Sequence, residues 1–125
     1  MKRDMDLIKD ILLKAEAISS EYFRSHEIED IKKKKEEIEY QIKIMCDAGF
    51  LEPIARPSVS PKRTEDILGY RITWFGHDFL DACRDEARWK QAKDIGAKIG
   101  GFTLEVLKQV LTQIMISQVK QVMGQ

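Results

Sequence analysis

Residues 37–51 read EIEYQIKIMCDAGFL, and this stretch decides the fold. Three of its apolar residues recur at steps of four and three, the spacing of a buried stripe on an amphipathic helix: Ile38, Ile42 and Met45. Gly49 follows at the position where many helices end in a left-handed residue. The pattern therefore predicts a helix over about 34–48 that leads directly into an extended segment over 50–54.

A second extended segment follows after a loop. Residues 56–66 contain two prolines and two serines, which is the composition of a loop. Residues 67–73 then alternate so that Tyr70 and Ile72 share one face of a strand. The two extended segments predict a β-hairpin with a long tip.

Helices are predicted on both sides of this stretch. Apolar residues at steps of three and four predict a helix over 4–17, and Thr73 is a good N-cap for a helix that runs to about Lys90. Glycines mark a break after that helix: Gly96, Gly100 and Gly101. A last helix is predicted over 103–122.

The sequence does not decide the conformation of residues 18–33. The spacing of Ile28 and Ile31 allows a turn of helix, whereas residues 26–29 alternate like a short strand.

The chain is thus expected to be mainly α with a small β-hairpin. Its order of elements matches a winged-helix domain, in which the recognition helix is followed directly by a two-stranded wing. We expect a winged-helix-like domain over 1–93. Residues 94–125 would form a C-terminal helical extension that serves oligomerisation.

Composition limits the possible partners and compartments. The 125 residues, of 14.5 kDa, contain 21 basic and 21 acidic residues, so any contact with nucleic acid has to come from a local patch. Two cysteines are too few for a disulfide framework, and the charged opening does not resemble a signal peptide. No apolar run is long enough for a membrane span. We expect a cytoplasmic protein without a membrane partner.

Two passages carry a resemblance to known proteins. Residues 37–51 look like the recognition helix and following Ala-Gly-Leu-Ile of many bacterial winged-helix regulators. Residues 69–82, GYRITWFGHDFLDA, are similar to the passage from their wing strand into the next helix. Together with the opening MKRDMDLI, the chain resembles a bacterial family of unknown function that is common in prophages and other mobile elements. The resemblance implies a winged-helix-like core and no activity, and the sequence shows no clear helix before the recognition helix.

The candidate DNA-binding residues lie on the 34–48 helix, at its N-terminal end and on the hairpin loop. They are Lys32, Lys33, Lys34, Lys35, Tyr40, Lys43, Arg56, Lys62 and Arg63. The lysine run (residues 32–35) lies where the helix dipole disfavours cations, so it faces either solvent or a polyanion. Against DNA, the helix side opposite the buried stripe also carries three carboxylates: Glu36, Glu39 and Asp47.

Other polar clusters favour structural roles. Three aspartates share one helical face and could bind Mg²⁺ or Mn²⁺, but ion pairs with Arg84 and Arg88 explain them better: Asp78, Asp81 and Asp85. The histidines and cysteines fit no zinc spacing and no convincing Cys–His nucleophile pair: His26, His77, Cys46 and Cys83. We expect no metal, no cofactor, no small-molecule substrate and no enzymatic activity.

The last helix is apolar over more than half of its circumference. One stripe can be covered within a single chain: Leu104, Leu107, Leu111 and Ile114. A second set is then left partly exposed: Val106, Val110, Met115 and Val119. We expect this second set to form the interface of a homodimer, which would also pair two recognition helices.

Two functions follow from the sequence. The first is a prophage-type winged-helix protein that binds double-stranded DNA, as a transcriptional regulator or another DNA-associated accessory factor. The second is a protein–protein interaction adaptor on the same scaffold that does not bind DNA. In the adaptor, the acidic helix face or the terminal helix would contact a protein partner.

Overall fold

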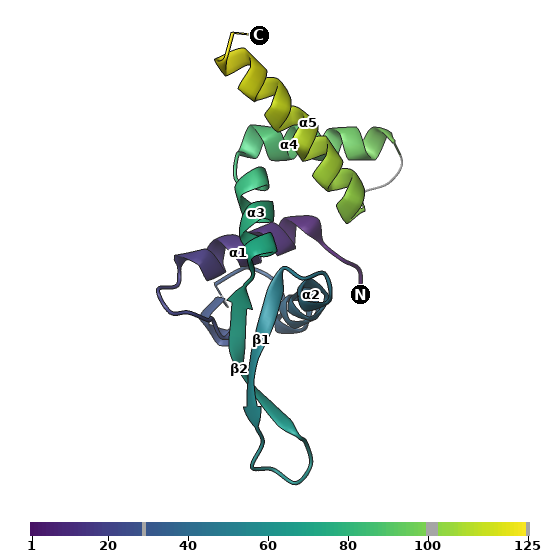
Figure 1. The fold of residues 1–125 in the computed structure, drawn as a ribbon. Coiled ribbons are helices and arrows are strands. Elements are labelled where there is room, and N and C mark those ends of the chain that lie inside the picture. Colours follow the sequence, from purple (N-terminus) through teal and green to yellow (C-terminus); the bar gives the residue numbers. More distant parts are fainter. Residues whose placement is uncertain (29, 100–102, 125) are drawn as a thin grey trace. The chain divides into compact units, whose positions relative to one another are not determined.

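The computed structural model describes residues 1–28, 30–99 and 103–124, which divide into two compact units, Met1–His77 and Asp78–Gln125 (Figure 1). The first unit contains α1 (Met5–Ala17), the 3₁₀ helix η1 (Ser25–Ile28), α2 (Lys35–Asp47), β1 (Leu51–Pro57), β2 (Glu65–Ile72) and the start of α3 (Trp74–Cys83). The second unit contains the rest of α3, α4 (Glu86–Lys98) and α5 (Leu104–Val122). The described chain is mainly helical with one small antiparallel hairpin, as the sequence predicts.

The core of the first unit forms where α1 packs against α2 and the base of the hairpin. Asp4 caps α1 because its carboxylate accepts a hydrogen bond from the backbone N–H of Leu7 at 3.1 Å. The buried face of α1 contributes apolar side chains: Leu7, Ile8, Ile11, Leu12 and Ala15. The predicted stripe of α2 is buried as well, with Ile42 only 1% exposed. Both amphipathic predictions are confirmed.

The segment that the sequence left open combines an isolated strand-like contact with a helical turn. Phe23 pairs with Tyr70 of β2 through two backbone hydrogen bonds, of 2.9 and 2.8 Å. The Phe23 side chain is buried, and its ring centroid lies 5.8 Å from that of Tyr70. Residues 25–28 then form η1, whose Ile28 is fully buried. The strand-like residue is therefore Phe23, and residues 26–28 are helical.

The transition from α2 into the hairpin follows the predicted pattern. Gly49 has a φ of +82°, the left-handed conformation that glycine adopts without strain, and the Phe50 N–H donates to the Met45 carbonyl at 2.9 Å. β1 and β2 pair antiparallel from Leu51 opposite Ile72 outward, with a register irregularity between Ile54 and Ala55. Both strands are longer at the outer end of the hairpin than predicted.

The predicted helix starts as expected, because the Thr73 hydroxyl caps α3 by accepting from the Gly76 N–H, but its predicted end near Lys90 is wrong, since two helices replace the one. α3 ends at Cys83, and α4 starts after Asp85, whose carboxylate accepts from the Arg88 N–H at 2.9 Å. A new N-cap therefore restarts the helix within the apolar pattern that suggested continuity. Gly96 does not break the chain but lies buried inside α4, since one glycine costs a helix only about 1 kcal/mol. Gly100 and Gly101 lie outside the described residues.

The second unit is built around the packing of α4 against α5. The Trp89 ring meets Phe79 edge-on, with centroids 6.4 Å apart, and Cys83 is fully buried. Among the described side chains of α5, three members of the predicted stripe are buried: Leu107, Leu111 and Ile114. The side chain of Leu104, the fourth member, lies outside the described ones. Residues 93 and 94, where the sequence suggested a division, both lie inside α4. No helix in the described ranges is long and apolar enough to cross a membrane.

Candidate nucleic-acid interface

The lysine run lies at the start of α2, and all four of its side chains are exposed. Lys34 occupies the N-cap position and makes no side-chain capping hydrogen bond, and Lys35 is the first residue of the helix. Among the described residues, no carboxylate lies within ion-pair distance of any of the four ammonium groups. These charges therefore face solvent at the end of a helix whose dipole does not stabilise them.

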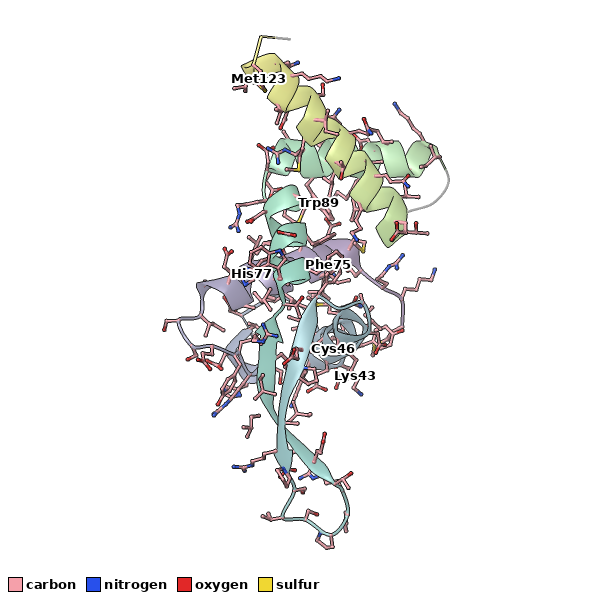
Figure 2. The ribbon with its side chains drawn as sticks, in the orientation of Figure 1. Lys43, Cys46, Phe75, His77, Trp89 and Met123 are labelled. Atoms are coloured by element: carbon pink, nitrogen blue, oxygen red, sulfur yellow. The ribbon has the colours of Figure 1, made fainter. Side chains whose placement is uncertain are left out.

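The outer side of α2 has the mixed charge that the sequence indicated. Lys43, labelled in Figure 2, is exposed on this helix. Tyr40 is half-buried. The carboxylates of the same side are exposed or half-buried: Glu36, Glu39 and Asp47. A negative DNA groove would meet one ammonium and three carboxylates on this face, which is poor complementarity.

The hairpin places its cations at its outer end, away from α1 and α2 (Figure 1). Arg56, Lys62 and Arg63 are all exposed. The guanidinium of Arg63 lies 3.0 Å from a carboxylate oxygen of Asp66, which offsets part of its charge. Arg56 and Lys62 have no such carboxylate among the described residues.

Thr73 ties the base of the hairpin to the end of α2. Its hydroxyl donates to the Gly49 carbonyl and accepts from the Gly76 N–H at 3.0 Å. The Thr73 N–H also donates to the Phe50 carbonyl at 3.1 Å. The Phe50 ring stacks on Phe75, with centroids 5.1 Å apart. These contacts join the residues just before β1 (49–50) to those just after β2 (73–76), so the orientation of the hairpin relative to α2 is fixed.

The N-terminal arm, residues 1–4, adds cations that are not among the residues predicted from the sequence. The side chain of Gln41 accepts from the Asp4 N–H and donates to the Lys2 carbonyl, both at 2.9 Å. Lys2, Arg3 and Lys33 consequently line one concavity of about 500 Å³. The available signal was Gln41 itself, a polar residue on the buried side of α2 that is only 2% exposed.

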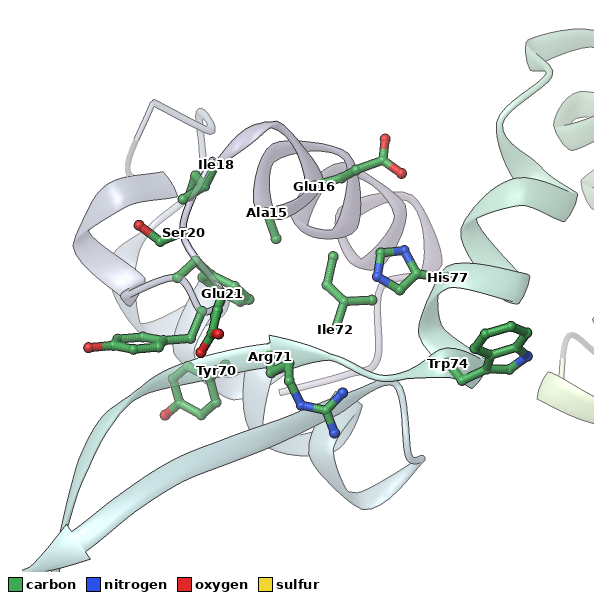
Figure 3. A pocket seen from close by; sticks show the side chains of 12 residues that line it. Ala15, Glu16, Ile18, Ser20, Glu21, Tyr70, Arg71, Ile72, Trp74 and His77 are labelled. Atoms are coloured by element: carbon green, nitrogen blue, oxygen red, sulfur yellow. The ribbon is translucent and has the colours of Figure 1, made fainter.

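A second concavity, of about 580 Å³, lies between the end of α1, the segment that follows it, β2 and the start of α3 (Figure 3). Ala15 and Ile72 point into it, and Glu16, Arg71 and His77 lie at its edge. The Arg71 guanidinium is engaged by Glu52 at 2.8 Å. Trp74 is 83% exposed at the rim. The lining mixes apolar and polar groups without a cluster of one charge.

Asp81 and Asp85 both contact nearby residues of the chain, and Cys46 is half-buried. In the described ranges, no three His, Cys, Asp or Glu side chains are grouped closely enough to hold a metal ion. The predicted ion pair of Asp81 with Arg84 is confirmed at 2.9 Å. Asp85 instead caps α4, so its contact with Arg88 is to the backbone N–H. Burial raises the pKa of the half-buried Cys46 thiol, and the charge of Asp47 adds to this effect.

Comparison with known proteins identifies a family. The model of a family described as "Hypothetical protein (DUF2513)" matches residues 2–103. The chain belongs to this family. An uncharacterized protein of Haemophilus influenzae is 34% identical over 121 residues, which cover 94% of this chain and 98% of the relative. No solved structure matches the chain. The DUF2513 match includes the N-terminal arm, the lysine run, α2 and the hairpin, and it ends just before α5.

The predicted dimer residues of α5 therefore lie beyond the DUF2513 match, and they do not share one face. At about 100° per residue, Val106 and Val110 point roughly opposite to Met115 and Val119. Val106 and Val110 are half-buried, whereas Met115 and Val119 are 37% and 55% exposed. The exposed apolar side chains of α5 instead gather in its C-terminal half and just after it: Met115, Ile116, Val119, Val122 and Met123.

Proposed function

We propose that this DUF2513 protein binds double-stranded DNA as a winged-helix module, with α2 as the recognition helix and the β1–β2 hairpin as the wing. The observation that carries the proposal is the hairpin itself. It follows α2 directly, is tied to it through Thr73, and bears Arg56, Lys62 and Arg63 at its outer end. With the lysine run, the first unit then offers two sets of exposed cations to the phosphate backbone.

The contact between Phe23 and Tyr70 supports the same proposal. It holds β2 to the segment after α1, so the hairpin is anchored on the side away from β1 as well. A single 3₁₀ turn, η1, stands where DNA-binding members of the class have a full helix. In our proposal the lysine run that follows η1 supplies the phosphate contacts expected from that position.

The function is tested by fluorescence anisotropy with fluorescein-labelled 20-bp duplexes of mixed sequence at low salt. Replacing residues 32–35 by alanine weakens all duplexes alike, because phosphate contacts carry no sequence information. Each lost contact lowers the slope of log affinity against log salt by about 0.9. The matched control replaces four exposed lysines of the second unit by alanine: Lys90, Lys98, Lys108 and Lys120. Absence of binding by the wild-type protein at high micromolar concentration overturns the proposal.

The biological role that fits such a module is that of a transcriptional regulator or accessory factor of a mobile element. A homodimer would present two copies of α2, as paired half-sites on DNA require. The role requires no catalysis, metal or cofactor, and we propose none.

The outer side of α2 favours a second candidate, a protein-interaction adaptor that does not bind DNA. Three carboxylates against one ammonium on this side suit a basic protein partner better than a phosphate backbone. Replacing Glu36, Glu39 and Asp47 by lysine separates the two candidates. The variant binds the duplexes several-fold more tightly if this side of α2 faces DNA. If the protein is an adaptor, the wild-type protein binds no duplex.

A further inference from the structure

The N-terminal arm is held along one face of α2 by a buried side chain. Gln41 receives the Asp4 N–H and donates to the Lys2 carbonyl, both at 2.9 Å, and is itself 2% exposed. Lys33, Glu37 and Gln41 follow at steps of four, so they lie along one face of the helix and the turn before it. The backbone of the arm is therefore positioned beside the lysine run.

Positive charge prevails in the concavity that the arm and α2 enclose. Lys2, Arg3 and Lys33 line it, and all three side chains are exposed. The Asp4 carboxylate accepts from the Leu7 N–H as the cap of α1, so this acid is engaged in the helix. Glu37 is the other carboxylate in the lining and is half-buried. Three cations converge here, although the sequence separates the arm from the lysine run.

We propose that Lys2 and Arg3 contact DNA phosphates as an extension of the surface formed by the lysine run, with Gln41 as the positioning residue. This inference rests on the proposed DNA-binding function. A phosphate suits the concavity because lysine and arginine donate charge-assisted hydrogen bonds to its oxygens. Gln41 contacts no phosphate itself, and acts by fixing the backbone that carries the two cations.

The test measures the affinity of the protein for a fluorescein-labelled duplex of about 20 bp and mixed sequence. The salt concentration is varied from about 50 to about 300 mM, a range over which counterion release can be measured. The double variant Lys2→Ala/Arg3→Ala weakens binding roughly tenfold per contact near 0.1 M salt and lowers the salt slope by about 0.9 per contact. Exchange of the two cations, Lys2→Arg/Arg3→Lys, keeps the affinity within about twofold because the charge is kept. Lys90→Ala/Lys98→Ala, in the second unit, is the matched control and leaves both quantities unchanged.

Gln41→Leu tests the positioning role. It produces the same loss of affinity and salt slope as the double variant, while a thermal melt verifies that the protein is folded. The triple variant that combines all three changes binds no more weakly than the double variant, because the arm is already lost as a contact. A purely structural role of Gln41 would leave the salt slope unchanged and the effects additive.

The outcomes separate this inference from the function on which it rests. If the wild-type protein binds no duplex, both are wrong. If it binds and the Lys2→Ala/Arg3→Ala variant has the wild-type affinity and slope, the arm is not part of the interface and the proposed function stands. If the Lys2→Ala/Arg3→Ala variant binds more weakly but the folded Gln41→Leu variant behaves like the wild type, the positioning role of Gln41 is wrong.

Discussion

The Thr73 hydroxyl contacts the Gly49 and Phe50 carbonyls and the Gly76 N–H, and the loss of these contacts is expected to destabilise the first unit. Thr73→Val keeps the shape of the side chain but leaves the Gly49 carbonyl and the Gly76 N–H without this partner. We expect the free energy of unfolding to fall by about 1–2 kcal/mol in urea titrations. Thr64→Val, at an exposed position of the hairpin loop, is the control and changes it by less than about 0.5 kcal/mol. If the two variants change the free energy of unfolding equally, the Thr73 hydroxyl does not stabilise the junction between the residues before β1 and those after β2.

Cys46 provides a pH-dependent signal. Burial, and secondarily the charge of Asp47, raises the pKa of its thiol above the ordinary value. The folded protein therefore holds this proton more tightly than the unfolded chain. The resulting stability is fully present below the unfolded pKa and is lost as pH rises through the folded one.

We accordingly expect Cys46 to be alkylated by iodoacetamide more slowly than free cysteine at pH 8–9, about the range where an ordinary thiol ionises. Site-resolved mass spectrometry of the modified peptides measures this rate. The same assay in urea, where the protein is unfolded, is the control and restores the ordinary rate. A folded-state rate equal to that of free cysteine contradicts the raised pKa.

At the scale of elements, α2 depends on its buried stripe. Ile42 is 1% exposed at the centre of that stripe, so Ile42→Ala leaves a cavity as well as losing apolar burial. We expect the free energy of unfolding to fall by about 2–5 kcal/mol, measured by urea titration. Lys43→Ala, at the next and exposed position, is the control. A melting curve of Ile42→Ala within error of the wild type would mean that the phase of the helix is wrong.

Elements with local signals were predictable from the sequence, and those that depend on distant partners were not. The apolar spacing in α2 and Gly49 after it mark the helix and its end within a few residues of chain. The conformation of Phe23 could not be predicted, because its backbone partner is Tyr70 in β2. The end of α3 has no local signal, because the apolar periodicity continues across it. The sequence predicts an ion pair for Asp85, whereas in the structure this residue is the N-cap of α4.

The candidate interface shows the same contrast. The cations of the lysine run and of the hairpin stand out as local runs and loops, and the structure shows them exposed. Lys2 and Arg3 carry no such signal, since their place beside Lys33 depends on the hydrogen bonds of Gln41. A polar residue on an otherwise apolar helix face was the clue to look for.

At the scale of the whole molecule, we predict a homodimer formed through the C-terminal half of α5. Its exposed side chains include Met115 and Val119, and Lys120 is the one charged residue from 109 to 125. Two copies can therefore pack there with little charge repulsion and remove apolar surface from water.

Light scattering behind size exclusion tests this prediction. We expect a mass near twice 14.5 kDa at tens of micromolar protein, a concentration of the order that reveals micromolar dimers. Met115→Lys/Val119→Lys reduces the mass to that of a monomer. Gln113→Lys/Ser117→Lys, exposed on another side of α5, adds the same charge and is the control. A wild-type mass near 14.5 kDa rules out the dimer.

The irregularity in the hairpin has a consequence for how this protein can evolve. Ile54 pairs with Gly69 and Ala55 with Ile67, so Leu68 is an extra residue that separates an inner from an outer half of the ladder. The inner half is constrained at Gly69, where an added side chain would collide with the Tyr22 ring and the Phe23 carbonyl. The outer half can gain or lose residues in pairs, each pair changing its reach by about 3.4 Å without altering the register at the base. Hairpins of different length are therefore compatible with the same base and the same helices.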